Sequence, residues 1–179
     1  MRSDGRYEVA VVPPFRTSPR PTRLETDTIV FHATAGASLA SDVRALHAEG
    51  YGYHYLIDRD GTVYKGAPTS MSVAHAGKSV GPQGESCNRY SVGVSFCNRN
   101  DNIEKITPAQ IGAAVKLCIE LASALPIKWI TTHRLITMDP VRKGRSRKVD
   151  PRLFDLDAMS KVTGIPFWEP WTDARLLPY

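Results

Sequence analysis

Two histidines and one aspartate have side chains of the types that bind a metal ion. His32 ends a short apolar, β-branched run, His133 closely follows another such run, and Asp150 lies on an irregular segment shortly afterwards. A single histidine at the end of a strand is more often structural than functional. Two imidazoles and one carboxylate nevertheless make a three-ligand set that leaves a fourth zinc position open. Their spacing in the sequence does not by itself show that they converge.

Apolar runs separated by turn residues predict the strands that would position these side chains. The turn sequence DRDG (58–61) lies between two such runs, which indicates a hairpin. The run that delivers His133 follows a proline at the end of a long helical pattern. We expect strands at residues 28–32, 53–57, 62–64, 91–97 and 127–131.

Two helices are expected between these strands. Ser38 can cap the first helix, which Gly50 ends. Thr107 can cap the second, Gln110 completes a capping box, and Pro126 ends it. The order of elements predicts an α/β fold, a single domain in which helices flank a mixed β-sheet.

Length and composition agree with one globular domain. The chain has 179 residues, of which 42% are apolar and 23% charged. Residues 1–26 are expected to form an N-terminal arm, 27–160 the catalytic domain, and 161–179 a C-terminal tail packed on that domain. In this tail, Trp168 and Trp171 either bind glycan or cover the core, and covering the core is the preferred interpretation.

No stretch reaches the length of a membrane span, and the apolar run at residues 9–12 is too short for a signal peptide. We therefore expect a protein without a membrane span that is cytoplasmic as synthesised. Cys87, Cys97 and Cys118 have no paired ligand spacing, so they are interpreted as buried apolar residues without a structural disulfide.

The net charge is +5, and the densest basic run is RKGRSRK at residues 142–148. This run is either a solvated loop or an attraction site for polyanions such as anionic wall polymers. No pattern of aromatic and basic residues suited to base stacking accompanies it, so no nucleic-acid partner is expected.

Six sequence motifs resemble the zinc-dependent N-acetylmuramoyl-L-alanine amidases of the type-2 family, and they occur in the family's order. This family includes phage lysozymes of the T7 type, recycling amidases and peptidoglycan recognition proteins. The motifs are IVFHATAG (29–36), GYHYLIDRDGTVYKG (52–66), VAHAG (73–77), NRYSVGVSF (88–96), TTHR (131–134) and KVDP (148–151).

The resemblance implies a Zn²⁺ site in a surface groove, with His32, His133 and Asp150 as the ligands. It also implies that Lys148 and Tyr53 are catalytic. Lysine is suited to stabilising developing negative charge, and tyrosine to relaying a proton or orienting water. The alternatives are that Lys148 only ends the basic run and that Tyr53 only packs in the core.

The resemblance further implies that His75 lines the substrate groove. The chain departs from many members at Ala33, where they have His or Asn. It departs from the recycling enzymes at Ser95, where they have a glutamate that is a candidate general base. His54 is interpreted as structural because strand alternation points it away from Tyr53.

Three functions follow from the resemblance. The first is hydrolysis of the amide between N-acetylmuramic acid and L-alanine by a phage-type endolysin that acts on the wall after the membrane is breached. The second is a cytoplasmic amidase that recycles muropeptides, and the third a non-catalytic peptidoglycan-binding module. The intact ligand set argues against the third. A monomer that acts on peptidoglycan or muropeptides is expected.

Overall fold

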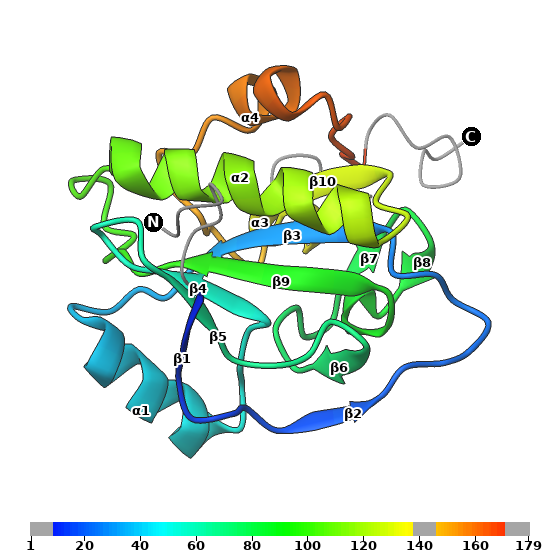
Figure 1. The fold of residues 1–179 in the computed structure, drawn as a ribbon, viewed down its shortest axis with the longest axis horizontal. Helices are drawn as coiled ribbons and strands as arrows, with labels where there is room; N and C mark the ends of the chain where they lie inside the picture. Colours follow the sequence, from blue (N-terminus) through cyan, green and yellow to red (C-terminus); the bar gives the residue numbers. More distant parts are fainter. Residues whose placement is uncertain (1–8, 138–145, 171–179) are drawn as a thin grey trace.

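A six-stranded sheet forms the centre of the protein, and its strand order is β1-β5-β4-β9-β3-β10 (Figure 1). The structure, a computed structural model, describes residues 9–137 and 146–170. Neighbouring strands are parallel except in the β4–β5 hairpin, where they are antiparallel. The strands are β1 (Val9–Val11), β3 (Thr28–Ala33), β4 (Tyr55–Ile57), β5 (Val63–Lys65), β9 (Ser91–Phe96) and β10 (Trp129–Thr132).

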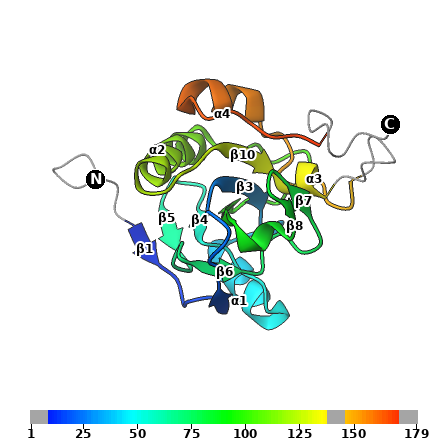
Figure 2. The same ribbon diagram turned by 90° about the vertical axis from the view of Figure 1, so that its right-hand side faces the viewer.

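Helices cover both faces of this sheet, as predicted for an α/β domain. Helices α2 and α4 lie on one side and α1 on the other, beside the short β2–β6 pair (Figure 2). The helices are α1 (Leu39–Glu49), α2 (Pro108–Ala124), α3 (His133–Ile136) and α4 (Leu156–Thr163). The remaining elements are β2 (Thr17–Pro19), β6 (Met71–Val73), β7 (Val80–Gly81), β8 (Gly84–Glu85) and the 3₁₀ helix η1 (Cys87–Arg89).

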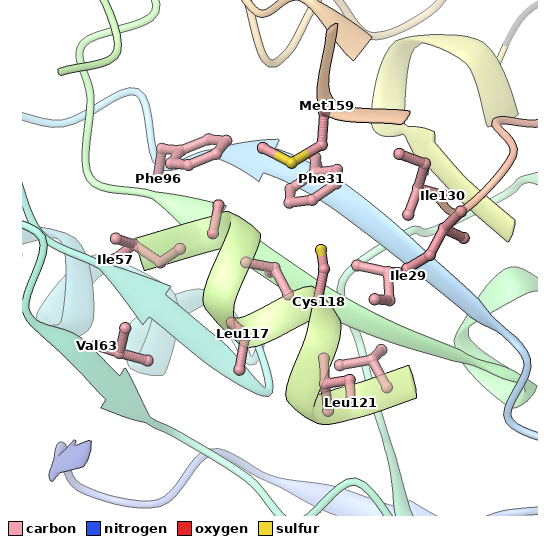
Figure 3. Packing of buried hydrophobic residues seen from close by; sticks show 14 of the residues in the cluster. Ile29, Phe31, Ile57, Val63, Phe96, Leu117, Cys118, Leu121, Ile130 and Met159 are labelled. Carbon is pink, nitrogen blue, oxygen red and sulfur yellow. The ribbon is translucent and has the colours of Figure 1, made fainter. Parts of the chain in front are cut away.

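The face under α2 holds the main hydrophobic core. Alternation along β3 turns Ile29 and Phe31 toward α2, where they meet Leu117 and Cys118 (Figure 3). Met159 of α4 extends this cluster. Burying a large apolar side chain of this kind contributes roughly 1.5–3 kcal/mol to the stability of the fold, so this layer stabilises the sheet on one face. The opposite face of the same strands is therefore free to carry polar side chains.

The helix ends follow the predicted caps. Ser38 and Thr107 each accept a hydrogen bond from the N3 amide of their helix, and both helices carry complete capping boxes. Gln110 also donates to the carbonyl oxygens of Ile57 and Cys97, which ties the start of α2 to the ends of β4 and β9. Strand β4 is shorter than expected, because it begins at Tyr55 and leaves Tyr53 and His54 in the preceding loop.

Part of the segment expected as an N-terminal arm contributes to the sheets. Strand β1 pairs with β5 at the edge of the central sheet, and β2 pairs with β6. Phe15 is buried between them, in space that exists because Gly52 and Gly66 lack side chains; a Cβ at either would lie within 2.5 Å of the Phe15 ring.

Arg20 continues this segment toward the interior. Its guanidinium donates hydrogen bonds to the carbonyl oxygens of Thr69, Asn88 and Ser91, at 2.9, 3.1 and 2.7 Å. Burial lowers the pKa of Arg20 to about 10. The arginine thereby links the N-terminal segment to the start of β9.

The described part of the C-terminal tail packs on β10. The Trp168 amide donates to the Ile130 carbonyl, and its side chain is buried beside Val30 and Ile136. Trp168 thus covers the core, whereas Trp171 lies outside the described residues. Cys87, Cys97 and Cys118 are all buried, as expected. Among the described helices, none has the length and apolar character needed to cross a membrane.

Candidate active site

His32, His133 and Asp150 converge at one end of the sheet, on the face opposite α2. The Asp150 Oδ2 atom lies 3.5 Å from His32 Nδ1 and 3.1 Å from His133 Nδ1. The two imidazole ring centroids are 4.5 Å apart. Three residues that are far apart in the sequence therefore form one buried group.

Local structure explains why each side chain arrives there. His32 lies near the carboxyl end of β3, and its alternation places it on the face opposite Phe31. His133 begins α3 directly after β10, at a helix start capped by Thr132. Asp150 is held through its backbone, because its carbonyl accepts from the Arg134 amide.

The chemistry of this group fits a metal ion. One potential ligand atom from each of the three residues lies within 4.8 Å of the others. The His32 Nδ1 atom is buried without a hydrogen-bond partner, although a buried polar atom is normally satisfied. A ring nitrogen without a hydrogen-bond partner can offer its lone pair to a metal ion. Together with a carboxylate and a second imidazole, it makes a donor set that zinc prefers.

Electrostatics keep these ligands in the forms that bind a cation. Burial, with a smaller contribution from His133, lowers the pKa of His32 to about 4, so the ring is neutral at pH 7. Burial opposes ionisation of Asp150, but the hydrogen bond from His133 and the close approach of His32 outweigh it and hold the carboxyl pKa well below its usual range. The group thus offers a neutral imidazole and a carboxylate.

A pocket of about 240 Å³ opens onto this group. Asp150, His133, Tyr53, His75 and Lys148 all line it. His32 does not line the cavity, but it is fully buried and its ring contacts those of Tyr53, His75 and His133.

Tyr53 packs its ring against His32, with centroids 4.9 Å apart. Burial, together with the nearby Asp150 charge, raises the pKa of Tyr53 above its ordinary value. The phenol is therefore a neutral hydrogen-bond donor at physiological pH, which favours orienting a water molecule over removing its proton.

Lys148 is exposed at the rim of the pocket. Its amide donates to Ser146 Oγ, which fixes the backbone, while the side chain remains in solvent. The Lys148 charge is close enough to His32 to help lower the pKa of that ring. A cation this close to His32 can stabilise negative charge that develops in the pocket.

His75 lines the pocket, but both of its ring nitrogens are engaged inside the fold. Nδ1 lies 3.0 Å from His32 Nε2, and Nε2 lies 3.2 Å from Ser91 Oγ. Gly93 makes room for the ring, since a Cβ at this position would lie 2.7 Å from His75 Cγ.

Ser91 and Gly93 were not identified as site residues from the sequence. The signal was present in β9, where small residues at Ser91, Gly93 and Ser95 alternate with apolar ones. Ser95 pairs in register with His32 on β3, and its hydroxyl is fully buried without a hydrogen-bond partner. His54 is structural, as expected, because its Nδ1 accepts from the Gly93 amide.

A larger cavity, of about 660 Å³, lies beside the same backbone segment. Lys148 and Pro151 border it, as do Arg134 and Arg152. Neither histidine of the ligand group reaches it, so the chemistry belongs to the smaller pocket.

The fold and the site together define a single α/β domain with a buried His-His-Asp group that can hold a metal ion. Residues 22–153 match the family Amidase_2, described as N-acetylmuramoyl-L-alanine amidase. The chain belongs to this family and is an enzyme of the amidase class. A comparison with curated protein sequences finds no match.

Solved structures with the same fold include three amidases. The selenomethionine derivative of AmpD is 24% identical, with a TM-score of 0.68 over 87% of this chain and 94% of that chain. The endolysin amidase LysCS from Clostridium intestinale URNW is 21% identical, with a TM-score of 0.64 over 88% and 96%. AmiD from E. coli, in complex with an anhydro-N-acetylmuramic acid peptide substrate, is 25% identical, with a TM-score of 0.68 over 83% and 60%.

Proposed function

We propose that the protein hydrolyses the amide bond between N-acetylmuramic acid and L-alanine in bacterial peptidoglycan, with Zn²⁺ as its metal. The buried His32 Nδ1, which lacks a hydrogen-bond partner beside Asp150 and His133, carries this proposal. The group lies beneath an open pocket in a chain that belongs to an amidase family.

His32, His133 and Asp150 would hold the ion. When bound, zinc supplies a Lewis acid for the scissile carbonyl and lowers the cost of activating water. This contribution is needed because an amide is a poor electrophile, whose hydrolysis builds negative charge on the carbonyl oxygen.

Lys148 stabilises that negative charge. It is exposed and lines the same pocket as the ligands His133 and Asp150. A preorganised cation of this kind contributes most when charge develops in the transition state. Tyr53 donates a hydrogen bond from its neutral phenol and orients the attacking water.

Two further positions shape the pocket. His75 contributes the edge of its ring to the wall that contacts substrate, while its nitrogens stay engaged with His32 and Ser91. Ser95 occupies the position where recycling amidases carry glutamate, and a serine hydroxyl takes up no proton at neutral pH. Proton transfer is therefore left to Lys148 and water, while Tyr53 orients the water.

The biological role proposed is that of a phage-type endolysin, which acts on the cell wall once the membrane is breached. Ser95 and the Tyr53–Lys148 pair favour this role over recycling. The endolysin LysCS shares the fold, but so does AmiD, which was solved with an anhydro-muropeptide substrate, so recycling of such fragments is the alternative. Of the basic run proposed to attract anionic wall polymers, only residues 146–148 are described, and Arg147 and Lys148 are exposed there.

Digestion of purified peptidoglycan, followed by mass spectrometry of the products, tests this function. We expect glycan strands freed of stem peptides, together with peptides that have a new L-alanine amino terminus. New reducing sugar ends would contradict an amidase. Cleavage of anhydro-muropeptides without cleavage of intact sacculi would contradict the endolysin role and support recycling.

A further inference from the structure

A chain of hydrogen bonds runs from the ligand group into the core. His32 Nε2 lies 3.0 Å from His75 Nδ1, and His75 Nε2 lies 3.2 Å from Ser91 Oγ. Ser91 Oγ in turn lies 2.6 Å from the carbonyl oxygen of Cys87. All three side chains are buried, so water does not compete for these contacts.

The carbonyl oxygen at the end of this series of hydrogen bonds determines which atom is the donor in each of them. A carbonyl oxygen can only accept, so the single Ser91 hydroxyl proton is committed to Cys87. Toward His75, Ser91 therefore acts as an acceptor, which requires the proton of a neutral His75 ring to be on Nε2. His75 Nδ1 then carries a lone pair and accepts the proton of His32 Nε2.

We infer that Ser91 and His75 are positioning residues that set the tautomer and ring orientation of His32, so that its Nδ1 presents a lone pair to the metal before the metal binds. A metal-binding histidine usually donates its second ring N–H to a carboxylate, a backbone carbonyl or water. Here the acceptor is the imidazole of His75, which in turn donates its own N–H to Ser91. The inference rests on the proposed metal site.

Two further contacts hold His75 in the position that this chain requires. The Asn88 side-chain oxygen accepts from the backbone amides of His75 and Ala76, at 3.1 and 2.7 Å. From the other side the ring lies against Gly93, where an added Cβ would come within 2.7–3.0 Å of three ring atoms. His75 therefore has no room to turn away from His32.

Nitrogen NMR of ¹⁵N-histidine-labelled, metal-free protein tests the tautomer directly. We expect a single neutral form of His32, protonated at Nε2 and bare at Nδ1, and His75 protonated at Nε2. A His32 ring protonated at Nδ1, or one that exchanges between both forms, would overturn the inference. This measurement uses neither metal nor substrate, so its result is independent of whether the protein hydrolyses peptidoglycan.

Zinc affinity, measured by competition with a chromophoric chelator, tests the consequence. Ser91→Ala removes the acceptor of His75, and Gly93→Ala displaces the His75 ring. Each should weaken zinc binding by about 10-fold or more, the scale seen when outer partners of metal ligands are removed. Ser160→Ala is the matched control, because the partly buried Ser160 of α4 also donates to a neighbouring carbonyl, that of Ile165, outside the histidine chain and the contacts that hold His75.

The pattern across the variants decides the outcome. Weaker zinc binding in Ser91→Ala and Gly93→Ala, with Ser160→Ala unchanged and melting temperatures in chelator similar for both serine variants, supports positioning by this hydrogen-bond chain. Equal zinc affinity in Ser91→Ala and wild type, or an equal loss in Ser160→Ala, would overturn it. Failure of the wild type to bind zinc would instead count against the proposed metal, and the NMR result would still decide the tautomer.

Discussion

The Asp150 Oδ2 atom lies 3.1 Å from His133 Nδ1 and carries the negative charge of the ligand group. Asp150→Ala should therefore abolish both zinc binding and hydrolysis. Metal analysis of dialysed protein should give about one zinc ion per wild-type chain and almost none for the variant. Asp157→Ala, which removes an exposed carboxylate paired with Lys161, is the control and should keep its zinc. Full activity of metal-free wild-type protein would contradict the proposed mechanism.

Lys148→Ala should separate metal binding from catalysis. Lys148 is exposed and is not one of the ligands, so zinc content and melting temperature should stay at the wild-type level. We expect kcat to fall on the order of 100-fold, the scale for loss of an oxyanion-stabilising group. Steady-state kinetics on a soluble muropeptide measure this. A rise in KM alone would show that the lysine binds the wall polymer without stabilising the reaction.

Tyr53→Phe should reduce kcat less than Lys148→Ala does. The phenol orients water through one hydrogen bond, so its loss should cost on the order of 10-fold. Because burial and Asp150 raise the pKa of Tyr53, the phenol stays neutral as pH rises through the assay range. The pH profiles of wild type and variant should therefore have the same alkaline limb, and a limb that disappears in Tyr53→Phe would show that Tyr53 ionises during catalysis.

Salt should reveal whether the basic run at residues 142–148 attracts the enzyme to the wall. Exposed charges are screened beyond about 8 Å at physiological ionic strength, so lysis of whole cells should weaken as salt rises. Turnover of a small muropeptide should barely respond. Neutralising Arg142, Lys143, Arg145 and Arg147, with Lys148 kept, should reproduce the high-salt behaviour on cells. Unchanged lysis by that variant would identify the run as a solvated loop.

Glu104 should make stability depend on pH. Its carboxylate binds Arg59, with Oε1 2.6 Å from Nε, and Arg59 also donates to the Gly36 carbonyl in the loop after β3. The hydrogen bond from Arg59 lowers the pKa of Glu104, so the stabilisation is present above the unfolded-state pKa and is lost as pH falls through the folded-state pKa. Glu104→Gln should cost about 1 kcal/mol at neutral pH, and this difference should vanish in acid. Urea unfolding at both pH values measures it, and an equal loss at both would contradict the ionic contribution.

Local patterns in the sequence were enough to predict the strand that carries His32 and the long helix that covers the sheet, but not the short helix α3 that begins at His133. The β-branched run of β3 and the capping box of α2 are signals that need no distant partner. The pairing of β1 with β5 was missed because each strand has only three residues and the contact joins distant parts of the chain. Short strands take their conformation from their neighbours, which a local pattern does not contain.

The site shows the same division. Residue types suggested a metal at His32, His133 and Asp150, and the family resemblance supplied the set, but only the fold shows a shared carboxylate oxygen between two rings. The position of Asp150 depends on the Arg134 amide, a backbone contact that no residue type encodes. The role of Ser91 was not predicted for a similar reason. Alternation along the strand predicts which face of the sheet Ser91 lies on, but not that it contacts His75.

Arg20 limits how far the protein can be truncated at its N-terminal side, or used in chimeras, without loss of stability. The family match begins at residue 22, just after the guanidinium that donates to the carbonyl oxygens of Thr69, Asn88 and Ser91. A fragment trimmed to the match would lose this donor. The Asn88 carbonyl would keep its hydrogen bond from Ser72, but each buried polar group left unpaired costs about 1–3 kcal/mol. The residues that match the family, 22–153, thus exclude Arg20, which supports the start of β9. Chimeras and minimal amidase fragments made from this chain should therefore keep Arg20 and the two strands before it.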